Sequence, residues 1–510
     1  MKFIKTFTAI SVATVLTACF HSSDEDETNT VAAKYHAYIV DHGGNINIVA
    51  DDGGSNVAFL TSIQPKNSKS EALGLGEVHF NQGKAFVIVQ SNMTNSAGDI
   101  VGGGVIVVDL ATQTVDATVP FESTKTNNIS RIVHTYVDPN GNYIWFNNDG
   151  PSGNADADSV FRMNWNTEDN DATDGDKYLD FTEIALGNGH KKGAFSFNDE
   201  TITDSVTVPL YFASHNLSDQ SVSLIDNDPA SSTFLEVTTV DFGPVTVGDA
   251  TLQNTPHGLE FSPLSGKFYI GITPGQDMAV AVIDTNNIPA NADAVRAASI
   301  SAGTDVQNKE IPGGGYIHSS KDHKFLYMVG KKDGVGYLSV VDPTNDSVVD
   351  VIDLGNISSS SFVYAHGHMD HDGMEMAINK VYVGASSATD YLDNVIKVVT
   401  IDPETGGMKA GTTVASITTN IGKGTRHRNG KGTSDGMHVY MPNGGGECTD
   451  HENMDPDCST VSVINTMTDT VLSKVHMTGH MPGSMGIVDV QDLNLMFTAV
   501  AADGHEHSHN

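Results

Sequence analysis

The feature that most constrains the fold of this chain is a unit of about fifty residues that recurs along it. The clearest copy contains Thr255-Pro-His257-Gly-Leu-Glu-Phe-Ser-Pro263, then Gly266-Lys-Phe-Tyr-Ile270, then Ala279-Val-Ala-Val-Ile-Asp284. Short apolar runs separated by Gly, Pro, Asn and Asp are typical of short β-strands joined by turns. Each unit therefore predicts a small antiparallel sheet of four strands.

Repetition of such a unit predicts a ring of sheets. Units begin near residues 74, 130, 188, 255, 312, 366 and 425. The remaining ends, 35–63 and 481–500, supply strands for one more sheet. We therefore predict an all-β fold, a single β-propeller of eight blades closed by strands from the N- and C-termini, with seven blades as the alternative.

The third strand of most units ends in Asp and is followed by a short polar turn, as in Leu338-Ser-Val-Val-Asp342. This pattern resembles the repeat of bacterial surface β-propellers. The resemblance covers nearly the whole of residues 35–500 and implies a propeller fold. It implies no particular chemistry, because propellers carry many functions.

Histidine is unusually abundant, with 21 residues against 27 Lys and Arg together. Two clusters stand out, one containing His366, His368 and His371, the other containing His505, His507 and His509. Neutral imidazole is the commonest protein ligand for zinc and copper. We predict that the first cluster holds a metal ion and that the tail, residues 501–510, captures the same ion more weakly.

Other histidines recur at one position of the repeat. In a four-stranded blade the first strand begins, and the second ends, at the same face of the disc. Histidines expected near the start of a first strand are His134, His190, His257, His366, His368 and His427, and those expected at the end of a second strand are His42 and His215. We predict that several converge at the mouth of the central channel. The alternative is that each makes hydrogen bonds between blades.

Zinc is the expected ion, since His with nearby Asp is a typical zinc donor set. Copper is the alternative, because Met477, Met481 and Met485 follow or flank histidines and thioether sulfur favours copper. An exported propeller with a His-rich flexible end resembles the periplasmic zinc-chaperone propellers. That resemblance implies the solute-binding protein of a metal importer as a partner. A weaker resemblance is to the propeller domain of nitrous oxide reductase, but no cupredoxin-like copper motif follows the propeller here.

The N-terminus has the pattern of an export signal. Two early lysines and an apolar stretch precede Leu16-Thr17-Ala18-Cys19. The position of Cys19 resembles the lipidated cysteine of bacterial lipoproteins. We therefore expect a signal peptide at 1–18, an acidic tether at 19–34, and a lipid anchor on the periplasmic side of a membrane or on the cell surface, with the outer membrane preferred.

The remaining cysteines, Cys448 and Cys458, lie in a polar loop and are expected to form a disulfide in an oxidising compartment. A paired thiolate metal site is the alternative. The formal net charge of −36 disfavours nucleic acid as a partner and attracts cations. The sequence has no motif typical of a hydrolase, metalloprotease or nucleotide-binding enzyme. A cell-surface interaction scaffold without metal chemistry remains the alternative function.

Overall fold

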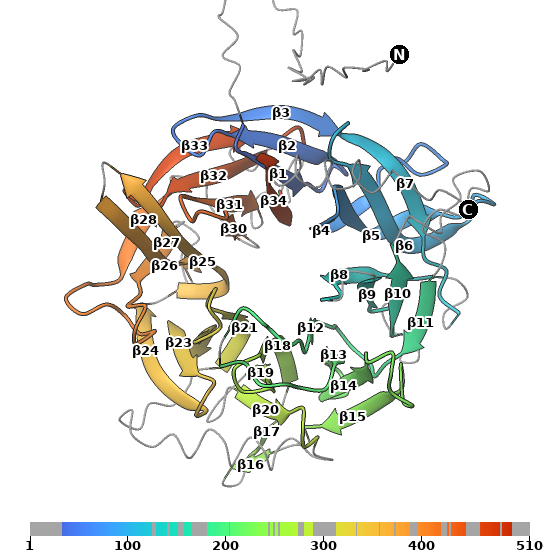
Figure 1. Cartoon of the computed structure of the whole chain (residues 1–510). Helices are drawn as coiled ribbons and strands as arrows, with labels where there is room; N and C mark the ends of the chain where they lie inside the picture. The colour runs from blue at the N-terminus through green and yellow to red at the C-terminus, as the bar shows by residue number, and fades with distance from the viewer. Residues whose placement is uncertain are drawn as a thin grey trace, which may run out of the picture.

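The computed structural model is a ring of β-sheets around a central channel (Figure 1). It describes residues 33–491 apart from the segments 125–128, 140–142, 151–157, 166–180, 203, 243–244, 248–249, 253–254, 274–279, 289–312, 333, 356, 372–373, 388–394, 420–425, 428–429, 445–458 and 480–481. The residues outside the described part include the predicted signal peptide with Cys19, the cysteines of the predicted disulfide, Cys448 and Cys458, and the tail residues His505, His507 and His509. Nothing among the described residues forms a helix of the length and hydrophobicity that crossing a bilayer requires.

The predicted all-β propeller of eight blades is confirmed. Each blade is an antiparallel sheet whose strands follow one another outward from the channel. The strands of blades one to three are β4 (Gly74–Asn81), β5 (Lys84–Thr94), β6 (Ile100–Asp109) and β7 (Thr114–Pro120); β8 (Ile132–Val137), β9 (Tyr143–Asn148), β10 (Ser159–Asn164) and β11 (Phe181–Ala185); β12 (Gly193–Phe195), β13 (Tyr211–Asn216), β14 (Ser221–Asp226) and β15 (Val237–Asp241).

Blades four to seven continue this order. A separate hairpin, β16 (Val245–Val247) and β17 (Ala250–Leu252), precedes blade four. The strands of these blades are β18 (Thr255–Ser262), β19 (Lys267–Thr273) and β20 (Val280–Asp284); β21 (Gly313–Ser319), β22 (Leu326–Lys332), β23 (Val335–Asp342) and β24 (Ser347–Gly355); β25 (Ile357–His371), β26 (Met374–Ser387), β27 (Val395–Thr400) and β28 (Ala415–Thr418); β29 (Arg426–His427), β30 (Lys431–Gly432), β31 (His438–Gly444), β32 (Thr460–Asn465) and β33 (Thr470–His476).

Blade eight closes the ring with strands from both ends of the chain, as predicted. Its innermost strand is β34 (Met485–Asp489), which pairs with β1 (Tyr35–Val40). The strands β2 (Ile46–Asp51) and β3 (Val57–Ile63) complete the sheet. Hydrogen bonds between β34 and β1 therefore join the two ends of the propeller.

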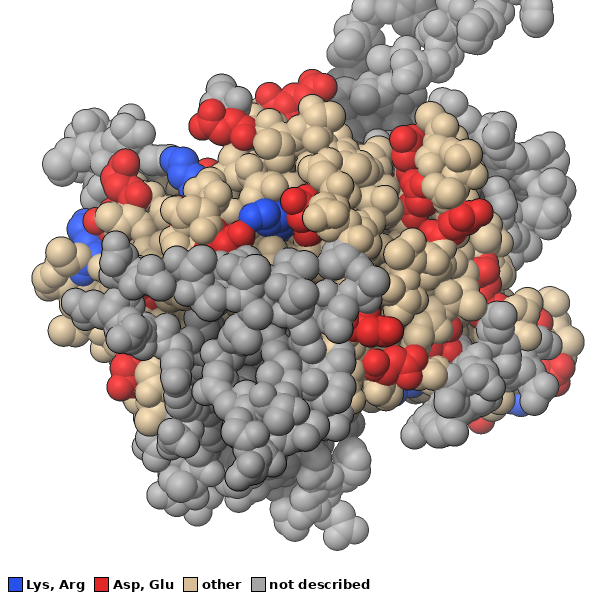
Figure 2. All heavy atoms as spheres, turned by 90° about the horizontal axis from the view of Figure 1, so that it is seen from below, with Lys and Arg blue, Asp and Glu red and all other residues tan. Residues whose placement is uncertain are grey.

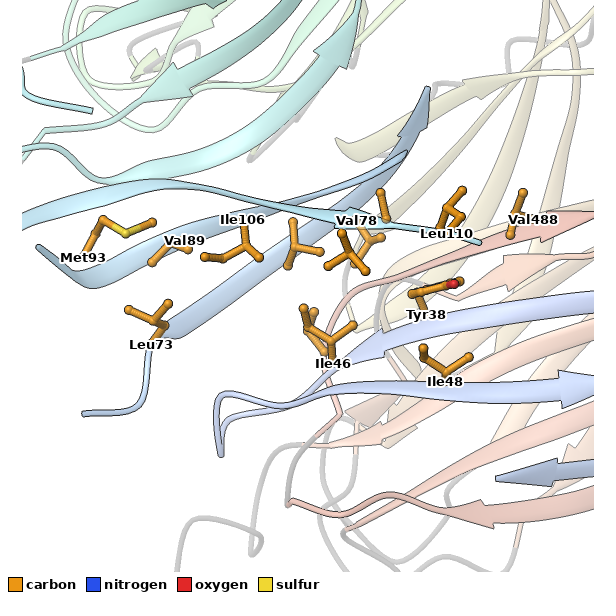
Figure 3. Packing of buried hydrophobic residues seen from close by; sticks show 14 of the residues in the cluster. Tyr38, Ile46, Ile48, Leu73, Val78, Val89, Met93, Ile106, Leu110 and Val488 are labelled. Atoms are coloured by element: carbon orange, nitrogen blue, oxygen red, sulfur yellow. The ribbon is translucent and has the colours of Figure 1, made fainter. Parts of the chain in front are cut away.

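The hydrophobic core lies between neighbouring blades. Figure 3 shows the junction of blades eight and one, where Tyr38, Ile46 and Ile48 face Val78 and Ile106. All five side chains are buried. Since each strand alternates its side chains between two faces, both faces of a middle blade strand pack against apolar neighbours. This explains why the second and third strands read as continuous apolar runs.

A polar contact between blades recurs at several junctions of the ring. Tyr382 of β26 donates its hydroxyl to Asp469 Oδ1 of the next blade at 2.6 Å, and Lys380 reaches Asp469 Oδ2 at 2.8 Å. Tyr269 makes the same contact with Asp346 at 2.6 Å. Asp346 and Asp469 both lie in turns at positive φ, 54° and 52°, so the left-handed turn conformation presents the carboxylate to the neighbouring blade. The contact ties blade four to blade five and blade six to blade seven.

At the ring closure a histidine takes the place of the lysine. Asp51 Oδ2 accepts hydrogen bonds from Tyr440 at 2.6 Å and from His438 Nδ1 at 2.8 Å. Burial by itself lowers the pKa of His438, but the hydrogen bond and charge of Asp51 outweigh it and raise that pKa above its usual value. The closure between blades seven and eight therefore contains a histidine that holds its proton more tightly when folded.

The raised pKa of His438 predicts a pH-dependent contribution to stability. A group whose pKa is higher in the folded state stabilises the fold fully below its unfolded pKa, about 6.5, and loses that contribution as pH rises through the folded value. We expect the difference in free energy of unfolding between the wild type and His438→Gln to narrow as pH rises from 6 to 9. Urea unfolding across that range measures it; a constant or widening difference contradicts the assignment.

Candidate metal centre

Four histidines from three neighbouring blades gather at one end of the channel; we call them the four-histidine cluster. His134 lies in β8 and His257 in β18, both near the start of an innermost strand, His215 lies near the end of β13, and His190 precedes β12. The ring centres of His134 and His190 are 5.2 Å apart. His190 is 6.0 Å from His257, and His215 is 6.3 Å from both of these rings.

β-Bulges at the start of the innermost strands help to place these side chains. The register of β18 on β19 shifts between Pro256 and Gly258, at His257. The register of β8 on β9 shifts between Ile132 and His134. A bulge inserts an extra residue into one strand and redirects the neighbouring side chain. The repeated bulge therefore redirects the strand where a blade meets the mouth of the channel.

Two carboxylates orient two of the imidazoles. Glu77 Oε1 lies 2.6 Å from His134 Nδ1, and Asp149 Oδ2 lies 2.8 Å from His190 Nδ1. Burial opposes ionisation of Glu77, but the imidazoles of His134 and His79 hold its pKa well below the usual range. A neutral imidazole that donates its Nδ1–H to a carboxylate keeps the lone pair on Nε2 for a metal ion. The two Nε2 atoms face each other at 3.4 Å.

His215 is the most deeply buried member of the cluster. Its side chain is fully buried, and neither Nδ1 nor Nε2 has a hydrogen-bond partner. Burial, reinforced by the charges of Lys192 and the other three imidazoles, lowers its pKa well below the usual value. Leaving a buried polar nitrogen unsatisfied costs about 1–3 kcal/mol. A metal ion bound in the cluster would satisfy one of these nitrogens.

A buried ion pair fixes the loop that carries His190. Lys191 is fully buried, and its Nζ donates to Asp158 Oδ2 at 3.1 Å and to the carbonyls of Gly187 and Gly189. The backbone N–H of Lys191 donates to Asp149 Oδ1 at 3.1 Å. Asp149 thus holds both the imidazole of His190 and the adjacent backbone. The contact of Nδ1 with Asp149 therefore fixes the orientation of the His190 ring, although the side chain is 34% exposed.

The spacing of the cluster fits a zinc site at one pair of histidines. Among the described residues, no three His, Cys, Asp or Glu side chains form a group that could hold a metal ion as they are placed. Tetrahedral zinc with Zn–N bonds of about 2.0–2.1 Å separates two ligand nitrogens by about 3.3 Å, which the His134–His190 pair matches at 3.4 Å. The ring centres of His215 and His257 lie 6.0–6.3 Å from their neighbours in the cluster, so these two side chains would have to move closer to join the pair as ligands.

The structure places His366 away from this cluster. The prediction that blade six begins near residue 366 was wrong, because its innermost strand β25 begins at Ile357. The register shift between Ser359 and Ser361 puts Ser360 at the position that His257 has in blade four. His366 lies six residues further on, or about 20 Å along an extended strand. Its Nδ1 contacts Asn379 Oδ1 at 2.6 Å, and its ring stacks on Tyr364.

The other predicted ligands lie where side chains are not described. His368 and His371 continue β25 toward its hairpin end, opposite Ala377 and Met374. His427 pairs with Asn443 in β29 and β31. The methionines that suggested copper are partly placed: Met477 and Met485 are buried in the core between blades seven and eight. Core packing therefore accounts for these two side chains.

Sequence reasoning missed the outer partners of the cluster. Glu77 and Asp149 are separated from their histidines by 57 and 41 residues, and no local pattern marks them. His215 was expected at this face but not among the ligands. Its context, a histidine at the end of an apolar second strand, is the signal that could have included it.

Comparisons with known proteins support the fold. No family model and no curated protein sequence matches this chain. Among solved structures, the dihydro-heme d1 dehydrogenase NirN is 13% identical, with 93% of this chain and 78% of that chain covered and a TM-score of 0.50. Apo AztD from Citrobacter koseri is 15% identical, covering 89% of this chain and 97% of that chain, with a TM-score of 0.42. At 13% identity the likeness to NirN concerns the fold alone.

Proposed function

We propose that this protein is an exported metal-handling propeller that binds zinc as its cargo at the four-histidine cluster. The observation that carries the proposal is the pair His134 and His190, whose Nδ1 atoms are held by Glu77 and Asp149 while their Nε2 atoms face each other at 3.4 Å. At this distance one Nε2–H can donate to the other Nε2, and a cation that takes the place of that proton can bind both lone pairs. Carboxylate–histidine pairs of this kind orient zinc ligands in proteins.

His215 and His257 would complete the donor set. Four imidazoles, with Glu77 and Asp149 outside them, supply two negative charges to balance a divalent cation. Burial keeps His215 neutral, which is the form that binds metal. The partial exposure of His190 provides a route for the ion from the face of the disc. A site with an open side suits cargo that must be loaded and released.

The four histidines bring no thioether or thiolate sulfur, which disfavours copper(I), and the 3.4 Å between the Nε2 atoms of His134 and His190 fits tetrahedral zinc. The acidic surface supports a cation-handling role, since acidic side chains predominate over basic ones on the outer side of the ring that Figure 2 shows. Such a surface raises the local concentration of cations. The proposal includes the predicted export signal and a lipid anchor at Cys19. It also includes the solute-binding protein of a metal importer as the partner. The alternative is a cell-surface scaffold in which the cluster only joins blades.

Equilibrium dialysis with elemental analysis tests the proposal. The protein without its signal peptide and the same protein lacking residues 501–510 should each retain one tightly bound zinc ion per chain. The rigid blades position the imidazoles before binding, whereas the tail must become ordered, so the deletion should remove only additional weak ions. A chain that retains no zinc would favour the scaffold. Loss of the tight ion with the tail would place the site at His505, His507 and His509 instead.

A further inference from the structure

A cavity of about 360 Å³ lies on the channel axis and reaches the four-histidine cluster at His134. Residues from the innermost strands of all eight blades line it. Its wall includes the aromatic side chains of Tyr136, Tyr316 and Phe362 together with Lys192. A space of this size, with aromatic walls and several polar and charged groups, can hold a small organic molecule.

The acidic residues of this cavity are already engaged by the wall. Glu77 accepts from the backbone N–H of Thr135 at 3.3 Å in addition to its contact with His134. Glu260 accepts a hydrogen bond from the Ser319 hydroxyl at 2.8 Å and lies 3.8 Å from His318. These carboxylates are therefore held by protein donors around the cavity. A ligand there would meet few free acceptors.

Lys192, in contrast to these carboxylates, is not held by a hydrogen bond to the cavity wall. Its Nζ is shielded from solvent and has no hydrogen-bond acceptor, and it lies 3.2 Å from the centre of the Tyr316 ring. The ring of Tyr316 in turn packs edge-on against His257 at 5.4 Å. Attraction to the ring offsets part of the desolvation of an ammonium, but its N–H donors still lack an acceptor. Lys192 is thus a buried donor beside the proposed metal site.

We propose that the cavity binds a small organic carboxylate together with the metal ion, with one oxygen accepting from Lys192 Nζ and the other directed toward the cluster at His134. The inference rests on the proposed zinc function. Lys192 offers the cavity a donor that has no acceptor, whereas Glu77 and Glu260 are held by protein donors, so an anion suits this part of the wall. The aromatic wall suits the carbon part of such an anion. A charge-assisted hydrogen bond to its oxygen would also fix its orientation.

Zinc affinity measured in two buffers tests this inference. The dissociation constant is determined by competition with a chromophoric chelator in acetate and in methanesulfonate, which has a similar size but coordinates metals weakly. Free zinc is corrected for its complex with acetate. We expect acetate to tighten zinc binding by about tenfold, the effect of one charge-assisted contact.

Two lysine variants separate the outcomes. Lys192→Met should bind zinc in methanesulfonate at least as tightly as the wild type, because a positive charge is removed from beside the cation, and should lose the acetate effect. Lys431→Met, which changes another lysine of the cavity wall, should keep it. An acetate effect that persists in Lys192→Met, or is absent from a wild type that binds zinc, overturns the carboxylate proposal alone. A wild type that binds no zinc in either buffer overturns both proposals.

Discussion

Replacing His134 and His190 together by alanine should abolish high-affinity zinc binding. The two imidazoles are the members of the cluster already at ligand spacing, with Nε2 atoms 3.4 Å apart. Losing two of four imidazole ligands should weaken binding at least about a thousandfold, since tight zinc sites need at least three protein ligands. Competition with a chromophoric chelator of known affinity measures the change.

A matched double variant controls for the loss of any two histidines. His366→Ala combined with His476→Ala removes two described histidines outside the cluster and should leave the tight site intact. Glu77→Gln keeps the shape of the side chain, removes its charge, and should weaken zinc binding by about 10–100-fold. Equal losses in the two double variants, or full affinity in His134→Ala/His190→Ala, would show that the four-histidine cluster is not the site.

Asp51→Ala should destabilise the ring more than any surface substitution. The Asp51 carboxylate accepts from His438 and Tyr440, and all three side chains are fully buried. Its removal leaves an imidazole and a phenol without their acceptor where blade seven meets blade eight. Breaking a buried ionic contact in this way costs about 3–5 kcal/mol. The urea concentration at the unfolding midpoint should fall accordingly.

The neighbouring residue provides the control for this substitution. Asp52 makes only local hydrogen bonds, to the backbone of Gly54 and to Asn56. Asp52→Ala should therefore change the free energy of unfolding by no more than about 1 kcal/mol. If both variants unfold at the same urea concentration, the buried contact of Asp51 does not hold the closure together.

The propeller could be predicted because its signal is local. Second and third strands such as Lys380-Val-Tyr-Val383 carry apolar residues on both faces, and turn residues separate them at regular intervals. The blade count and the closure by β1 and β34 follow from counting these runs. The start of blade six could not be counted in the same way, because its first hairpin continues past His366 to His371 and Met374. An extended hairpin keeps the same alternation as an ordinary strand, so periodicity does not reveal its length.

The sequence by itself determined that blades repeat, that the ends meet, and that histidines recur where first strands begin. Strand period and turn chemistry act over a few residues, and for that reason they can be read without coordinates. Only the tertiary structure decided that His134, His190, His215 and His257 share one end of the channel while His366 lies elsewhere. The tertiary structure also showed that Glu77 contacts His134, that Asp149 contacts His190, and that Lys192 lies beside the cavity. These relations depend on bulges and on the packing of separate blades, which bring together residues far apart in the chain.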